Sequence, residues 1–155
     1  MAAPRWLALA TLVIFSASAY AEDHATQVWL NPGVLTHHFR EGDFREDNYG
    51  IGAEVVIAPE HALLAGTFIN SDRERSRYAG YYWRPWEWKP GGVSVKPGLV
   101  LALFDGYSNT NHGHWFPAAF PSVSAEYGIY GANVALVTNP KNGAALALQL
   151  KLQVW

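Results

Sequence analysis

Cysteine is absent from this sequence of 155 residues, and only 15% of its residues are charged. No disulfide can therefore hold the fold, and a short exported chain needs another closed framework, such as a fully hydrogen-bonded barrel. The net charge is −2, so no strong basic field is present and nucleic acid is not expected as a partner. No apolar run approaches the roughly 20 residues that a membrane-spanning helix needs. If the chain enters a membrane, we expect it to do so as a β-barrel.

The N-terminus has the pattern of an export signal. Arg5 precedes a short apolar stretch, Trp6 to Phe15, which is followed by the small-x-small motif Ala19-Tyr20-Ala21. This order predicts a signal peptide, residues 1–21, that is cleaved after Ala21. A membrane anchor is the alternative, but the apolar stretch is short for one. Residues 22–155 have a length typical of a single domain.

The rest of the sequence favours β-structure. Aromatic residues make up 14% of the chain, and glycine and proline recur at short intervals, as expected of strands separated by turns. About eight strand-like segments have close to the ~9–11 residues of a tilted transmembrane strand. We therefore predict an all-β fold, a small antiparallel up-and-down β-barrel of about eight strands. The expected strands are Val28–His38, Tyr49–Ala58, Ala62–Asn70, Tyr78–Trp86, Val93–Phe104, Trp115–Tyr127, Gly131–Thr138 and Ala144–Trp155.

The expected connections alternate in length. Tight turns are predicted near residues 59–60, 89–92 and 128–130, and mostly longer polar loops at 40–48, 71–77, 105–114 and 139–143. Short turns at one rim and long loops at the other are typical of outer-membrane barrels. The sequence thus predicts export to the outer membrane, and a single-chain barrel is expected to be a monomer.

The last strand has the clearest alternation. Leucines occupy every second position from Leu146 to Leu152, with Gln149, Lys151 and Gln153 between them. In a membrane the leucines would face lipid and the polar side chains the lumen, whereas a soluble barrel would exchange the two faces. Trp155 is the usual ending of an outer-membrane barrel, yet it is out of phase with the leucines. A soluble periplasmic barrel that carries lipid therefore stays open as an alternative.

Polar residues able to do chemistry gather at the rim of the long loops. Alternating strand directions bring the strand ends at His37-His38, Asn70-Ser71 and Asp105 to this rim, near His112 and His114. Serine, histidine and an orienting polar group are the ingredients of acyl transfer. The alternative is that they are solvated loop residues without a catalytic role. The His112-x-His114 pair lacks supporting ligands, so no metal site is expected.

Two other groups of side chains have a simpler interpretation. The charged run Asp72–Arg77 is typical of a solvated loop, or of a contact through its three arginines with lipopolysaccharide phosphates. Tryptophans 83, 86, 88 and 115 lie near strand ends, where an aromatic girdle at the membrane interface explains them better than a ligand cage does.

Three stretches resemble the lipid A palmitoyltransferase (PagP) family of outer-membrane enzymes. In the first, Pro32-Gly-Val-Leu-Thr-His37, a proline stands five residues before a histidine. The second is Phe68-Ile-Asn-Ser71, followed by Ala-Gly-Tyr at 79–81 and by Trp83. The third is a series of residues at similar spacing, namely Pro117, Pro121, Ser124, Tyr127, Gly128 and Pro140.

The resemblance implies an eight-stranded barrel that moves an acyl chain from a phospholipid donor to lipid A or a related acceptor, without a metal or cofactor. His37 is then expected to be the general base and Ser71 its polar or nucleophilic partner. Asn70 stands at the position of the family's aspartate. Prolines leave gaps in the barrel wall because they remove ladder hydrogen bonds. Lateral lipid entry is expected where Pro117 and Pro121 lie opposite Pro140, and at a second gap beside Pro32, although bulge prolines without this role are the alternative.

The sequence departs from the family in three respects. Asn70 carries no charge, although an amide can still orient an imidazole or donate to an oxyanion; Asp72 or Asp105 could otherwise replace the carboxylate. Tyr82 stands where the family has a glycine at the floor of its acyl pocket, so an inward Tyr82 predicts chains shorter than palmitate. The family's N-terminal amphipathic helix has little room before the first strand. A barrel that binds lipid without catalysis is therefore the alternative function.

Overall fold

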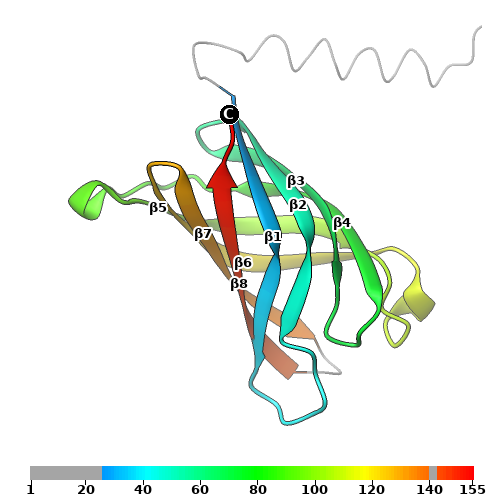
Figure 1. Cartoon of the computed structure of the whole chain (residues 1–155). Coiled ribbons are helices and arrows are strands. Elements are labelled where there is room, and N and C mark those ends of the chain that lie inside the picture. Colours follow the sequence, from blue (N-terminus) through cyan, green and yellow to red (C-terminus); the bar gives the residue numbers. More distant parts are fainter. Residues whose placement is uncertain (1–25, 140–142) are drawn as a thin grey trace, which may run out of the picture.

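The computed structural model describes residues 26–139 and 143–155. Within these residues, eight antiparallel strands pair in sequence order and close into a barrel (Figure 1), which confirms the predicted fold class. The predicted signal peptide (residues 1–21) and Pro140 lie outside the described residues. The strands are β1 (Gln27–His38), β2 (Asp47–Ala58), β3 (His61–Ile69), β4 (Arg75–Trp83), β5 (Ser94–Phe104), β6 (Phe116–Tyr127), β7 (Tyr130–Asn139) and β8 (Gly143–Gln153).

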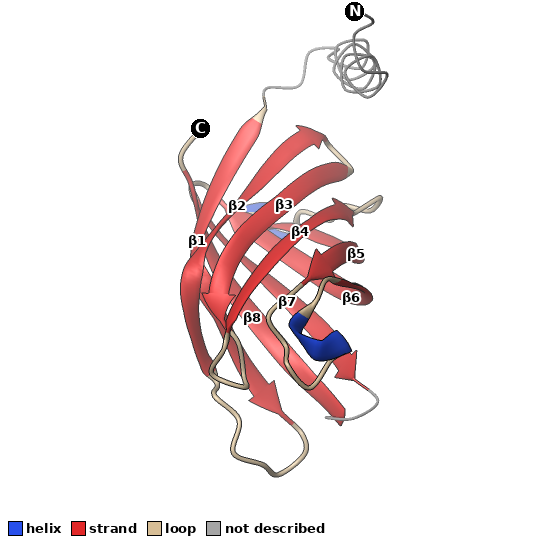
Figure 2. Cartoon of the chain, turned by 90° about the vertical axis from the view of Figure 1, so that its right-hand side faces the viewer, coloured by secondary structure: helices blue, strands red, loops and turns tan. Residues whose placement is uncertain are grey.

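The two ends of the barrel differ as expected except at the β4–β5 connection, where residues 84–93 replace the tight turn predicted at 89–92. The β1–β2, β3–β4 and β5–β6 connections share one rim, and the β2–β3, β4–β5 and β6–β7 connections share the other, together with the C-terminus (Figures 1 and 2). We call them the loop rim and the turn rim. Short 3-10 helices occur at residues 90–92 and 111–113. Among the described residues, no helix has the length and apolarity needed to cross a bilayer.

Strand β4 is shifted relative to its predicted position. It begins at Arg75 and ends at Trp83, not at Tyr78 and Trp86, so half of the charged run predicted as a loop belongs to a strand. The reason is alternation, because Ser76 is fully buried while Arg75 and Arg77 face outwards. A strand can carry such charges on its outer face near a rim. The following connection to β5 is correspondingly longer than predicted.

Alternation also separates the two faces of the wall. Lys151 is 5% exposed and lies inside the barrel, whereas the leucines next to it in β8 face outwards. Trp155 lies past the end of β8, beside β1, where the Val28 amide donates to its carbonyl at 3.0 Å. The outer surface carries large apolar side chains on every strand, among them Leu35, Ile51, Leu63, Trp83, Leu101, Val123, Val134 and Leu150.

A bulge in β1 reverses its two faces. The pairing with β2 shifts between Asn31 and Gly33, and Gly33 has a φ of +117°. Before the bulge the buried side chains include Trp29 and Asn31; after it the even-numbered positions turn inwards. A one-residue slip has this effect because side chains alternate with a period of two.

Ladder pairing is missing from several stretches of the wall, among them residues 94–98 of β5, which have no partner in β4, and two stretches that adjoin β7 and β8. Strand β6 pairs with β7 only from Ser122 to Tyr127, so its first half, with Pro117 and Pro121, pairs with β5 alone. Strand β1 pairs with β8 at Leu30 and again at Leu35, with a register shift between them around Pro32. We call these the β6–β7 seam and the β1–β8 seam.

Candidate functional site: a cavity open to the loop rim

The barrel contains a cavity of about 240 Å³ in the half nearer the loop rim. Its walls are mostly apolar and aromatic, with Leu64, Phe68, Val100, Phe104, Phe116 and Phe120 among the lining residues. Inward positions of β3, β5 and β6 supply them, so a strand sequence that alternates outward and inward apolar residues builds both the apolar outer surface and this lining. The cavity suits an apolar chain better than a polar solute.

The mouth of the cavity brings together His38, Ser71 and Asp72, all of which line it. The Nδ1 atom of His38 and the Oδ2 atom of Asp72 are buried without a hydrogen-bond partner among the described residues. The His38 ring stacks on Phe44 at a centroid distance of 4.3 Å, which limits its rotation. A histidine, a hydroxyl and a carboxylate thus share the entrance of an apolar cavity.

His37 is placed differently from the expected base. It is 70% exposed, faces outwards and lies 3.5 Å through Nδ1 from Oε1 of Glu46, and it does not line the cavity. Its neighbour His38 faces inwards because the bulge at Gly33 has exchanged the faces of β1. Ser71 and His38 therefore line the same cavity, and His37 does not.

Asn70 is fully buried and organises the β3–β4 loop. Its Oδ1 accepts hydrogen bonds from the backbone N–H groups of Asp72 and Glu74, both at 3.0 Å, and its Nδ2 donates to the Gly106 carbonyl at 2.9 Å. An aspartate could not make this last bond, since an ionised carboxylate has no proton to donate. The amide is thus engaged with the backbone, and the carboxylate at the cavity mouth comes from Asp72.

Hydrogen bonds tie the rim loops together around the mouth. The Arg45 amide donates to the Ser71 carbonyl at 2.9 Å, and the Ser108 amide donates to Glu74 at 2.8 Å. Hydrogen bonding to Ser108, by its side chain first and then by its amide, lowers the pKa of Glu74. Burial, with a smaller contribution from Asp72, raises the pKa of Tyr107, which lines the cavity. These contacts fix the β3–β4 loop, which carries Ser71 and Asp72, against the neighbouring loops.

The charged run at this rim is largely paired. Arg73 lies 2.7 Å from Asp43, and Arg77 pairs with Asp105, which is 5% exposed. Burial alone would raise the pKa of Asp105, but the hydrogen bonds from Arg77 outweigh it and hold this pKa below its ordinary value. His112 and His114 lie in the same region, and the described residues contain no group of three potential metal ligands.

Tyr82 closes part of the inner end of the cavity. Its side chain points inwards and is 1% exposed, and it lines the cavity. Its hydroxyl donates to the Lys96 carbonyl at 3.4 Å, and the Arg84 guanidinium lies over its ring at 5.6 Å. The ring occupies space that a glycine would leave open, so the cavity is short.

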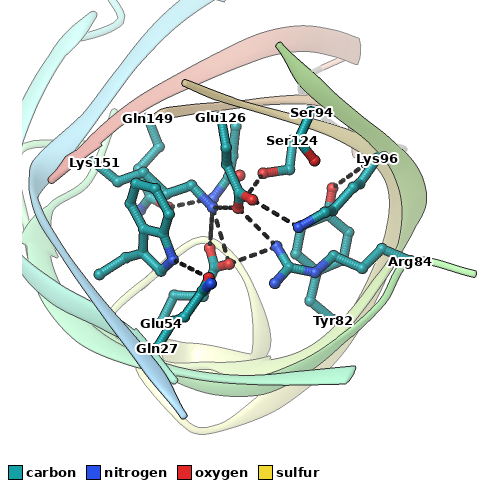
Figure 3. Close-up of polar contacts among 12 residues, drawn as sticks. Gln27, Glu54, Tyr82, Arg84, Ser94, Lys96, Ser124, Glu126, Gln149 and Lys151 are labelled. Carbon is teal, nitrogen blue, oxygen red and sulfur yellow. Dashed lines mark hydrogen bonds and ion pairs between the residues drawn. The ribbon is translucent and has the colours of Figure 1, made fainter. Parts of the chain in front are cut away.

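Beyond Tyr82, a cluster of ion pairs fills the half of the barrel nearer the turn rim (Figure 3). Nη1 of Arg84 lies 2.7 Å from Glu54 and 3.1 Å from Glu126, and Nζ of Lys151 lies 2.9 and 2.7 Å from the same carboxylates. Lys96 adds a contact of 2.8 Å with Glu126. We call these five side chains the ion cluster. Three cations, Arg84, Lys96 and Lys151, share the two carboxylates, and Nε and Nη2 of Arg84 have no hydrogen-bond partner among the described residues. Mutual pairing lets the cluster be tolerated inside the wall, where its side chains occupy the lumen.

Most of the ion cluster and the inward position of His38 were not predicted from the sequence. Single charges within apolar strand segments, such as Glu54 and Glu126, were the available signal for the cluster. For His38 the signal was the Pro32-Gly33 pair, since a proline and a glycine inside a strand often mark a bulge. Pro32, Pro117 and Pro121 all lie in the seams.

No protein-family model matches the chain, and no curated protein sequence shows a significant match to it. The fold is compatible with an outer-membrane barrel.

Proposed function

We propose that this protein is an outer-membrane acyltransferase of the PagP-like type, which takes an acyl chain from a phospholipid into its cavity and passes it to lipid A or a related acceptor. The observation that carries the proposal is the apolar cavity with His38, Ser71 and Asp72 at its mouth. An acyl chain inside the cavity would place its ester near the mouth, where these three side chains can act on it.

The membrane location rests on the outer surface. Apolar side chains face outwards on all eight strands, and aromatic residues such as Trp83, Trp86, Tyr130 and Trp115 are exposed near the rims. Of the charged side chains within the strands, Glu54, Lys96, Glu126 and Lys151 lie in the lumen, and those on the outer face, Asp47, Arg75 and Arg77, lie at the loop rim. A soluble carrier needs the opposite arrangement, so this distribution favours the membrane barrel over the periplasmic one. Extraction from cell envelopes only with detergent, and not with urea, is the expected behaviour.

In the proposed reaction His38 acts as the general base. Its imidazole takes the proton of the Ser71 hydroxyl, which attacks the ester carbonyl of the phospholipid, while Asp72 stabilises the imidazolium that forms. The proton passes to the lyso-phospholipid oxygen as its bond to the acyl carbon breaks, and the acyl chain stays as an ester on Ser71. His38 then takes the proton of the acceptor hydroxyl, which attacks this ester, and the proton returns to the Ser71 oxygen as the acylated acceptor leaves. The β6–β7 and β1–β8 seams, where prolines interrupt the ladder, are the proposed routes of lateral entry for the lipid.

A lipid-binding barrel without catalysis is the second candidate. Two observations favour it: His37 points away from the cavity, and the Asn70 amide is fully engaged in its loop. Both remove residues that the resemblance implied would be catalytic. Both candidates bind a lipid chain in the cavity. They differ only in whether the residues at its mouth catalyse acyl transfer.

Mass spectrometry of lipids from cells that express the wild type or Ser71→Ala separates the two. The proposal predicts a new acylated lipid species in wild-type cells and its loss in Ser71→Ala, with both proteins present in the outer membrane at equal amounts. If the wild type is folded and inserted but produces no new species, the non-catalytic barrel replaces the acyltransferase.

A further inference from the structure

Two arginines at the start of β4 face outwards at the loop rim. Arg75 and Arg77 lie on the same face of the strand, because side chains alternate and the buried Ser76 stands between them. Arg75 is exposed, and its side chain makes no hydrogen bond or ion pair with the described residues. On a barrel wall this cation is available to an anion from outside the chain.

The second arginine is held in place by the strands beside it. Nε of Arg77 donates to Oδ2 of Asp105 at 2.7 Å, and its guanidinium lies 5.4 Å from the centroid of the Trp115 ring. The Arg77 side chain is nevertheless 65% exposed, while Asp105 is 5% exposed. The carboxylate and the indole therefore orient the guanidinium, and it is the cation that faces outwards. We call Arg75, Arg77 and Trp115 the outer-wall patch.

Below the outer-wall patch the wall becomes apolar. The next outward residue of β4, Ala79, pairs with Leu103 of β5, and Leu103 pairs with Pro117 of β6. Leu103 is exposed. The patch is thus the polar border of an apolar band, with a tryptophan at the border as in membrane-interface belts. A lipid that lays its chains on this band would bring its phosphate to the level of the two arginines.

The third arginine of the charged run lies elsewhere. Arg73 has a φ of +64° and turns towards the β1–β2 loop, where its Nη2 lies 2.7 Å from Oδ1 of Asp43. The same β3–β4 loop carries Ser71, and Arg75 begins the strand that follows it. The outer-wall patch therefore lies on the outside of the hairpin whose loop lines the cavity mouth.

We propose that the outer-wall patch binds a phosphate group of lipid A and so docks this acceptor beside the cavity mouth. Arginine suits the role because its planar N–H groups can make two parallel hydrogen bonds to a phosphate. A phosphate monoester carries about 1.5–2 negative charges at pH 7, which favours it over the singly charged phosphodiester of a phospholipid. The inference rests on the outer-membrane location in the proposed function and deepens it by naming an acceptor site.

The test compares lipid A that carries both of its phosphates with the same lipid A after both are removed. Binding of each to the mature protein, refolded in detergent micelles, is measured by native mass spectrometry. The wild type is expected to bind the phosphorylated form at least tenfold more tightly. Arg75→Gln is expected to reduce this ratio at least threefold, and its fold is safe because the side chain has no described partner to lose. Arg75→Gln/Arg77→Gln should bring the ratio close to one.

Arg73→Gln is the matched control, because it removes an arginine of the same hairpin that faces Asp43, and it should leave the ratio unchanged. Comparing ratios between variants cancels the different partition of the two lipids into micelles. A ratio near one in the wild type, or an equal loss in Arg73→Gln and Arg75→Gln, would overturn the assignment. Displacement of lipid A by an equal concentration of phosphatidylglycerol would also overturn it, in favour of a phospholipid headgroup. In each case binding of lipid by the cavity, and with it the proposed function, would stand.

Discussion

At the residue scale, one glycine decides which histidine faces the cavity. Without the bulge, the alternation that places Trp29 and Asn31 inside would also place His37 inside and His38 outside. Gly33 permits the bulge because it adopts a φ of +117° and because a Cβ atom there would lie 2.3 Å from the Asn48 carbonyl oxygen. The resemblance pointed to His37, and a pattern of spacings cannot reveal a slip of one residue.

Gly33→Ala tests this interpretation. The substitution combines a strained backbone with a steric clash, and we expect it to lower the free energy of unfolding by about 2–3 kcal/mol. Gly128→Ala is the control, since Gly128 also has a positive φ, of +57°, but no atom within 4 Å of the added Cβ, and the expected loss there is about 1 kcal/mol. Urea unfolding in lipid vesicles measures both. Equal losses would contradict the structural role of Gly33.

Tyr82 sets the depth of the cavity. Tyr82→Ala removes an inward ring and should lengthen the preferred acyl chain by roughly two to four carbons, because the space that it leaves adjoins the apolar side chains of Val56, Ala62 and Val100 as well as Arg84. The measurement is the chain-length profile of fatty-acid binding. Tyr81→Ala removes a ring of the same size from the outward face and is expected to leave the profile unchanged. An unchanged profile in Tyr82→Ala would show that another side chain limits the chain length.

At the element scale, most strands and their ends were predictable, and β4 was not. Seven of the predicted strands agree with the observed ones to within two residues at each end, because a period of two with glycine and proline between segments is a strong local signal. Strand β4 was displaced by three residues, since charges at 75–77 favour a loop locally while tertiary pairing with β3 extends the strand. The ion cluster was hidden for the same reason, as its members are brought together only by closure of the barrel.

The contact between Arg77 of β4 and Asp105 after β5 predicts a dependence on pH. The pKa of Asp105 is lowered in the folded protein. Its contact with Arg77 therefore contributes fully to the free energy of unfolding above the unfolded pKa of about 3.9, and this contribution is lost as the pH falls through the lower, folded value. Asp105→Asn should therefore destabilise by about 1 kcal/mol at pH 7 and by much less near pH 2.

Unfolding midpoints at the two pH values measure this difference. Asp43→Asn is the control, because Asp43 is 90% exposed in its pair with Arg73 and should have little effect at either pH. A loss for Asp105→Asn that is equal at both pH values would mean that the side chain acts through its shape and not through its charge.

The β6–β7 seam predicts a kinetic effect. Pro117→Ala/Pro121→Ala restores two backbone donors and should let the ladder extend, which would slow uptake of vesicle-embedded phospholipid severalfold. Binding of a short free fatty acid through the mouth should not change. Pro97→Ala is the control, since Pro97 lies in a paired part of β5, opposite Val123. Unaltered phospholipid uptake in the double variant would argue against entry at this seam.

At the scale of the whole molecule, the barrel is open at the loop rim and filled by side chains towards the turn rim, so it does not form a channel. The apolar cavity opens at the loop rim, and the ion cluster fills the lumen below it (Figure 3). Removing one member leaves a buried charge without its partner, and Glu54→Gln should destabilise the protein by about 3 kcal/mol or more. Glu87→Gln near the turn rim, where Glu87 is 40% exposed, should have a small effect. Similar losses for both would show that the cluster is not needed for stability.

The proposed acyl transfer takes place at the cavity mouth and depends on His38. Comparing variants of His38 and His37 tests this claim most directly. Acyl transfer from phospholipid to lipid A is followed by mass spectrometry with wild type, His38→Ala and His37→Ala, all refolded in vesicles. The account predicts that His38→Ala lowers the rate by about 10²–10⁴-fold, as loss of a general base does, while His37→Ala stays close to the wild type. Transfer that survives in His38→Ala and is lost in His37→Ala would contradict it.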